Sequence, residues 1–192
     1  MKRSLFFALI FMLFACSNDP KSGQEGVPAV ASTPTAPASP VSTPDGQPAR
    51  LDATLTLVAA PNTIKKGGEA CIDITCAGFV DLVSMQYTML WDKSILAFKE
   101  VKSFGLPYLG PNSFGAHRSA EGELTFVWID NSLKGVTKPD GSILFQVCFS
   151  AVGNTGQASA FRFSDQPTAI EAVHKDVKLV NFQGVEGVIK VQ

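Results

Sequence analysis

The stretch that decides the fold reads Met85-Gln86-Tyr87-Thr88-Met89-Leu90-Trp91-Asp92-Lys93-Ser94-Ile95-Leu96-Ala97-Phe98. Large apolar side chains occupy every second position up to Trp91, which is the period of a β-strand with one buried face. Asp92 follows at once, and its carboxylate is expected to accept backbone N–H groups and close a turn. The stretch therefore predicts two consecutive strands joined by a tight connection.

Runs of the same kind extend on both sides of this stretch. We expect strands over 54–59, 69–76, 82–91, 96–102, 123–130, 143–151, 158–164 and 177–191, the last divided near Gly184. Turn signals such as Pro139-Asp140-Gly141 lie between them. No segment keeps a helical apolar period over the twelve or so residues that a convincing helix needs. Many short strands without intervening helices predict an all-β sandwich of two antiparallel sheets.

The large aromatic residues follow the inward phase of the predicted strands. Tyr87 and Trp91 share the phase of Met85 and Met89, and Phe126 and Trp128 share that of Leu124. We expect them to fill the core between the sheets. Sugar stacking needs exposed rings, and the best candidate is Tyr108 in the long connection 104–114, although packing over the end of the sandwich is the favoured interpretation for that connection too.

The amino-terminal segment has the features of an export signal. Lys2 and Arg3 precede an apolar run over 5–14 that is shorter than the roughly 20 residues of a membrane-spanning helix. Leu13-Phe14-Ala15-Cys16 resembles the lipobox of bacterial lipoproteins, in which the cysteine is acylated after cleavage before it. We expect a signal peptide over 1–15 and lipidation of Cys16. An ordinary secretory signal with an incidental cysteine is the alternative.

A proline-rich stretch separates Cys16 from the predicted strands. Residues 16–52 are dominated by Pro, Ser, Thr, Ala and Gly, a composition that cannot bury enough surface to offset ordering entropy. We expect a disordered, semi-extended linker that leads to one domain over 53–192. Without residues 1–15 the chain has 14 basic and 17 acidic side chains. This near-neutral balance lacks the clustered basic face of a nucleic-acid-binding protein.

Strand alternation assigns the cysteines of the domain to faces. Cys71 and Cys148 fall on the outward phases of the strands over 69–76 and 143–151, and Cys76 falls on an inward phase. Because export favours disulfides, we expect a Cys71–Cys148 bridge between neighbouring strands. Cys76 is expected to be a buried thiol. Three reduced, packed thiols are the alternative.

The succession of these features resembles the cohesin domain. The resemblance is carried by Lys66-Gly67-Gly68 before a strand, by the stretch over 85–98, by the strand over 122–130 and by the Asp140-Gly141 turn. It covers residues 53–192 and implies a nine-stranded jelly-roll β-sandwich, related to a group of carbohydrate-binding modules, that binds dockerin domains. In that fold the second and seventh strands are neighbours, which would place Cys71 beside Cys148.

The resemblance also implies which sheet face receives a partner. In cohesins the third, sixth and eighth strands share the dockerin-binding sheet, and its outward positions here are Ser84, Gln86, Thr88, Leu90, Thr125, Val127, Ile129, Ala160, Arg162 and Ser164. Cellulosomal members commonly have Asn and Asp where this chain has Ser84 and Gln86, a departure from the pattern of typical dockerin recognition. A mixed apolar and polar face suits a protein interface, and a plain solvent-facing sheet is the alternative.

Enzymatic function finds no support in the residues. The two histidines, His117 and His174, lack the spaced ligands of a metal site, and Asp73, Asp92 and Asp130 have ordinary turn or surface roles. No phosphate-binding loop or nucleophile motif occurs, and no cofactor or metal is expected. We expect a non-catalytic, extracytoplasmic binding module, anchored by lipid to a bacterial membrane or the cell surface, whose partner is a protein such as a dockerin-bearing polysaccharide-degrading enzyme. A carbohydrate-binding module and a structural envelope lipoprotein are the alternatives.

Overall fold

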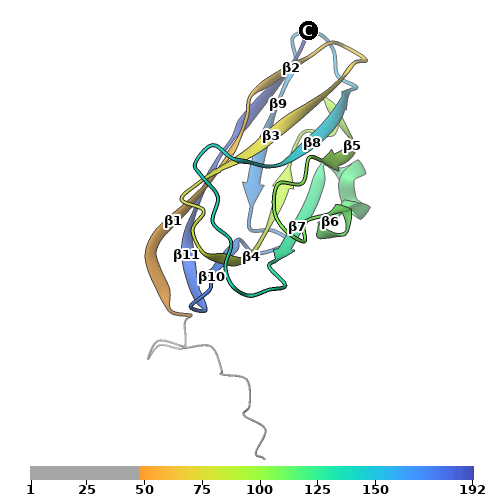
Figure 1. The fold of residues 1–192 in the computed structure, drawn as a ribbon. Coiled ribbons are helices and arrows are strands. Elements are labelled where there is room, and N and C mark those ends of the chain that lie inside the picture. Colours follow the sequence, from red (N-terminus) through yellow and green to blue (C-terminus); the bar gives the residue numbers. More distant parts are fainter. Residues whose placement is uncertain (1–47) are drawn as a thin grey trace, which may run out of the picture. The chain divides into compact units, whose positions relative to one another are not determined.

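The chain folds as a β-rich domain, and the computed structural model describes residues 48–192 (Figure 1). Two short 3-10 segments, η1 (Pro111–Ser113) and η2 (Ala116–Glu121), interrupt the strands. The strands are β1 (Arg50–Ala59), β2 (Asn62–Ile64), β3 (Glu69–Ala77), β4 (Leu82–Leu90), β5 (Leu96–Lys102), β6 (Phe114–Gly115), β7 (Glu123–Ile129), β8 (Ile143–Ala151), β9 (Ala158–Ser164), β10 (Glu171–His174), β11 (Lys178–Val185) and β12 (Gly187–Val191).

Alternation of apolar and polar residues accounts for the long strands. In β7 the side chains of Leu124, Phe126 and Trp128 are buried, whereas Val127 and Ile129 are exposed. One face of the strand therefore belongs to the core and the other to the surface.

The strand pairing gives two layers. One layer has the order β11-β1-β3-β8-β5 and the other β12-β9-β4-β7-β6, with only the β1–β11 pair parallel inside them. β10 pairs with β4 of one layer and with β11 of the other, and β2 pairs with β12. The short strand β10 therefore joins the two layers, and Figure 1 shows it near β11 and β4.

Aromatic rings fill the space between the layers. Phe126 on β7 stacks on Phe145 of β8 with ring centroids 5.3 Å apart, although these strands share no backbone pairing. Trp91 meets Phe149 of β8 at 5.1 Å in an edge-on arrangement. Such pairs add to the free energy of apolar burial. They place the core between the sheets and confirm the predicted β-sandwich with its aromatic centre.

The predicted strands are all present, and three short ones were not predicted. The division of the last predicted strand falls at Glu186, two residues beyond Gly184, and β1 begins at Arg50, within the segment predicted as linker. The additional strands β2, β6 and β10 have only two to four residues. Alternation has too few positions to reveal such short strands, which form because a neighbouring strand offers free backbone groups.

The cysteines lie where strand alternation puts them. Cys71 on β3 stands directly opposite Cys148 on β8, and the two form a disulfide. Cys76 is a buried free thiol whose pKa is raised, chiefly by burial. The Asp92 turn is also confirmed, because its Oδ1 accepts the Ser94 backbone N–H at 2.8 Å and the Ser94 hydroxyl at 2.6 Å.

Within residues 48–192, no helix has the length and apolar character needed to cross a membrane. The predicted signal peptide over 1–15, the lipidation site Cys16 and the linker up to residue 47 lie outside the described residues. These three assignments stay predictions.

Candidate functional site

The candidate site is the outward surface of β4 and β7, called here the β4–β7 face. The two strands are antiparallel, with Ser84 opposite Ile129 and Gln86 opposite Val127. Inward neighbours such as Met85 and Trp128 are buried and fix the strands to the core. The alternation that builds the core therefore also presents this set of side chains on the opposite side.

Two aliphatic side chains form the centre of the β4–β7 face. Val127 is 44% exposed and Ile129 is 50% exposed, and they are adjacent outward positions on β7. A small hollow beside them is also lined by Ser84, Gln86 and Glu171. An apolar centre with polar groups at its border is the anatomy of a protein–protein interface.

The border along β4 is set by β10, which was not predicted. Glu171 on β10 stands opposite Gln86, and the Gln86 Nε2 group donates to the Glu171 Oε2 atom at 3.2 Å. β9 pairs with β4 only over 88–90, where Arg162 stands opposite Leu90. The predicted flanking strand thus borders one half of the face, and β10 borders the other.

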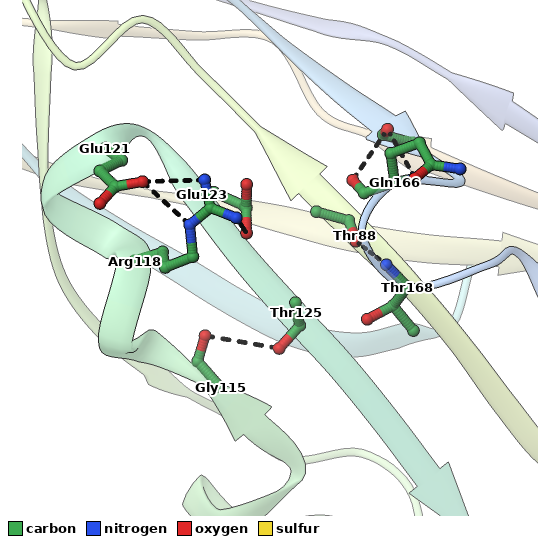
Figure 2. A network of polar contacts seen from close by, with 9 residues as sticks. Thr88, Gly115, Arg118, Glu121, Glu123, Thr125, Gln166 and Thr168 are labelled. Atoms are coloured by element: carbon green, nitrogen blue, oxygen red, sulfur yellow. Dashed lines mark hydrogen bonds and ion pairs between the residues drawn. The ribbon is translucent and has the colours of Figure 1, made fainter.

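Thr88 was predicted to belong to the exposed face, and this prediction is wrong. It points outward but is 0% exposed, because the connection over 165–170 between β9 and β10 covers it. The Thr168 backbone N–H donates to Thr88 Oγ1 at 3.1 Å, and Ser164 and Gln166 form a local turn beside it (Figure 2). Thr88 is therefore a structural residue that fixes this connection, and a partner cannot reach it directly.

The remaining predicted positions lie at the edges of the face. Ser84, Gln86, Leu90 and Thr125 are half-buried, and Arg162 is exposed. The Thr125 hydroxyl lies 3.5 Å from the Gly115 carbonyl oxygen of β6, as Figure 2 shows. On β4 and β7 the exposed apolar area is therefore concentrated at Val127 and Ile129.

A charged cluster ends the face near the start of β7. Arg118 of η2 lies 2.9 Å from the Glu121 carboxylate and 3.2 Å from that of Glu123, which is largely buried (Figure 2). The hydrogen bond with Glu121 and the charge of Glu123 raise the pKa of Arg118. The cluster fixes η2 against β7 and places a polar boundary at this end.

The aromatic residues considered for other activities differ in exposure. Tyr108 is 60% exposed, so the favoured interpretation of packing over the end of the sandwich does not hold for this ring. Trp91 and Trp128 are buried, and their indole N–H groups donate to the carbonyl oxygens of Leu96 and Pro107. Within residues 48–192 no group of three or more metal-binding side chains is assembled.

The comparisons with known proteins find similarity in structure. No protein-family model matches the sequence, and no curated protein is significantly similar to it. A cohesin in a type I cohesin–dockerin complex from Clostridium thermocellum has 12% identity, with 72% of this chain and 99% of that chain covered and a TM-score of 0.62.

Two further solved structures support the same fold assignment. A cohesin from Clostridium acetobutylicum, solved in solution, has 17% identity, with 73% of this chain and 92% of that chain covered and a TM-score of 0.58. A non-cellulosomal cohesin from the archaeon Archaeoglobus fulgidus has 17% identity, the same coverage of 73% and 92%, and a TM-score of 0.57. The chain therefore has the fold of cohesins, as its sequence predicted.

Proposed function

We propose that this chain is a non-catalytic, cohesin-like binding module that captures a dockerin-like domain of a secreted protein, such as a polysaccharide-degrading enzyme. The observation that carries the proposal is the exposed pair Val127 and Ile129 at the centre of the β4–β7 face. The fold supports the choice of partner, since solved cohesins of this fold include one in complex with a dockerin.

The chemistry of the β4–β7 face suits capture of a folded protein. Burial of Val127 and Ile129 against a partner removes apolar surface from water, which is the main favourable contribution to association. Gln86 and Glu171 leave hydrogen-bonding capacity at the border, where polar groups set orientation. Ser84 and Gln86 replace the Asn and Asp common in cellulosomal cohesins, so we expect a partner whose polar contacts differ from those of typical dockerins.

The proposed location is outside the cytoplasm, at a bacterial membrane. The lipobox-like sequence ending at Cys16 and the proline-rich segment after it support a lipid anchor with a spacer. A tether of this kind raises the effective concentration of a captured partner at the membrane without any additional contact.

The proposal is tested by affinity capture from culture supernatant with the wild-type chain and two variants. Val127→Arg puts a charge at the centre of the face and should abolish recovery of a dockerin-bearing protein. Val152→Arg is the matched control. Val152 is also an exposed aliphatic residue, but it directly follows β8 and lies outside the β4–β7 face. Recovery that survives Val127→Arg would remove the β4–β7 face from consideration.

Tyr108 gives a specific reason to test carbohydrate binding as a second function. Its ring is open to solvent, although Val127 and Ile129 give the protein-binding face more apolar area. Retention of the chain on an insoluble glycan, weakened by Tyr108→Ala and unaffected by Val127→Arg, would support that function. If neither a protein nor a glycan is bound, a structural role in the envelope is favoured.

A further inference from the structure

Three loops converge at one end of the sandwich. They span 78–81 between β3 and β4, 130–142 between β7 and β8, and 175–177 between β10 and β11. The Lys175 backbone N–H donates to the Asp81 carbonyl oxygen at 2.8 Å, which joins the first loop to the third. We call this end of the molecule the loop end.

The chain enters the domain at the loop end. The Leu179 backbone N–H donates to the Ala49 carbonyl oxygen at 2.9 Å, and Arg50, the first residue of β1, stands opposite Leu179 at the start of β11. Figure 1 shows the start of β1 beside the turn between β10 and β11. Ala49 and Arg50, the residues through which the chain enters β1, therefore lie at the loop end.

Each of the three loops presents an exposed aliphatic side chain. Val80 is 53% exposed, Leu133 is 67% exposed and Val177 is 55% exposed. Leu133 has φ 53° and Val177 has φ 58°, a left-handed conformation that is unfavourable for residues with bulky or β-branched side chains. Strained residues persist where the surrounding structure enforces them, and they concentrate at functional sites.

Hydrogen bonds enforce the positions of these loop tips. The Asp130 carboxylate accepts the Ser132 backbone N–H at 3.0 Å and the Gly135 backbone N–H at 3.1 Å, which fixes the turn that carries Leu133. The Asp81 backbone N–H donates to the Thr137 hydroxyl at 3.0 Å. The exposed side chains are therefore presented by ordered loops.

Lysine side chains at the loop end are available to an anionic partner. Three carboxylates there contact protein groups: Asp81 pairs with Lys175 at 2.6 Å, Asp130 accepts hydrogen bonds from its loop, and Asp140 accepts the Gly78 backbone N–H. The Asp176 carboxylate is exposed. Within residues 48–192 the ammonium groups of Lys134, Lys138 and Lys178 form no ion pair. Lys134 directly follows Leu133 and Lys178 directly follows Val177.

We infer that the loop end rests on the surface of a lipid bilayer, with Val80, Leu133 and Val177 in the interfacial region and the three lysines at anionic headgroups. Aliphatic tips bordered by lysines match this environment, because the alkyl stems of lysine lie along apolar surface while the charge stays in water. The inference rests on the membrane anchor proposed above, since the chain enters the domain at this end. The β4–β7 face lies on the side of the sandwich and borders the loop end at Ile129.

The test places an environment-sensitive fluorophore at single introduced cysteines. Leu133→Cys and Val177→Cys report on the loop end, and Val152→Cys is the control, because Val152 is also 55% exposed but follows the far end of β8. Cys76 is 1% exposed and the other two domain cysteines are bonded, so labelling is selective. The lipidated chain is reconstituted into phosphatidylcholine vesicles with and without phosphatidylglycerol.

We expect emission from the labels at 133 and 177 to shift to shorter wavelength on reconstitution, more strongly with phosphatidylglycerol, and the label at 152 to stay unchanged. Unchanged emission from the labels at 133 and 177 would overturn the inference. An equal shift of the label at 152 would overturn it too. So would a shift that appears when the protein is concentrated without vesicles, because that would indicate contact with a second copy of the chain.

A second arm separates this inference from the proposed anchor. A chain that begins at residue 16 and carries Cys16→Ser has no lipid, and at high vesicle concentration it should give the same site pattern with smaller amplitude. Intact mass of the chain from its bacterial host reports lipidation independently. A chain without lipid but with the expected label pattern would contradict the anchor alone, and a lipidated chain without the pattern would contradict the loop-end inference alone.

Discussion

At the scale of single residues, the buried hydroxyl of Tyr87 is the least satisfied group in the core. Tyr87 is 0% exposed, and within residues 48–192 its hydroxyl has no hydrogen-bond partner. Burial raises the pKa of Tyr87 well above its ordinary value, so the phenol stays neutral. The ring itself is well packed, with Phe126 at 4.8 Å and Phe163 at 5.4 Å between centroids.

We therefore expect Tyr87→Phe to leave the fold intact and to raise the free energy of unfolding by about 1 kcal/mol, because a buried polar group without a partner is costly. Urea denaturation of the two proteins measures the difference. A loss of stability of similar size would mean that the hydroxyl has a partner in solution.

Asp130 stabilises the folded state through its ionised carboxylate. The Ser132 hydroxyl donates to it, as do backbone N–H groups of the following loop, and these hydrogen bonds lower the pKa of Asp130. The folded pKa lies below the value of about 3.9 for an unfolded aspartate. Between those two values the unfolded chain binds more protons, so this stabilisation is present above pH 4 and is lost as pH falls through the folded pKa.

Asp130→Asn should consequently lower the free energy of unfolding at pH 7, and the difference from wild type should shrink below about pH 4. Denaturant titrations at a series of pH values measure this gap. A gap that is constant from pH 7 to pH 3 would show that the charge of Asp130 has no part in the effect.

At the scale of elements, the sequence predicted the long strands and missed contacts made by short segments. Strands of seven to ten residues such as β1, β4, β7 and β8 reveal themselves by alternation. β10 has four residues, and its pairing with β4 depends on a contact between positions about 85 apart in the chain. The burial of Thr88 has the same cause, since its cover comes from 80 residues later.

Thr88→Val tests the role of this cover. The variant keeps the shape of the side chain but removes the acceptor of the Thr168 N–H, which we expect to cost about 1 kcal/mol and to loosen the connection over 165–170. Hydrogen exchange of these amides should be faster in Thr88→Val than in wild type. In Thr88→Ser, which keeps the hydroxyl, it should stay slow, and equal rates in both variants would contradict the assigned hydrogen bond.

The disulfide joins β3 to β8 and closes a loop with a sequence separation of 77 residues. In the chain-entropy model such a link contributes about 4 to 5 kcal/mol, so Cys71→Ala with Cys148→Ala should lose most of that stability. Alkylation of the unfolded wild-type domain should modify Cys76 alone before reduction and all three cysteines afterwards. Three modified cysteines before reduction would exclude the bridge.

At the scale of the whole molecule, the β4–β7 face and the loop end have separate roles in this account. The sequence predicted the β-sandwich and the outward positions of the β4–β7 face, because both follow from a period of two along the strands. It did not predict the three loop tips. Val80, Leu133 and Val177 are far apart in the sequence, and only the folded chain brings them to one end.

The central claim is that the β4–β7 face binds a dockerin-like partner through Val127 and Ile129. Calorimetric titration of the purified partner into wild type, Val127→Arg and Val152→Arg tests it most directly, with unfolding curves to confirm that both variants are folded. We predict that Val127→Arg weakens binding at least 100-fold, a loss of about 2.7 kcal/mol, as expected when a charge enters the apolar centre of an interface. Val152→Arg should bind as wild type does. Equal affinity of Val127→Arg and wild type would contradict the claim.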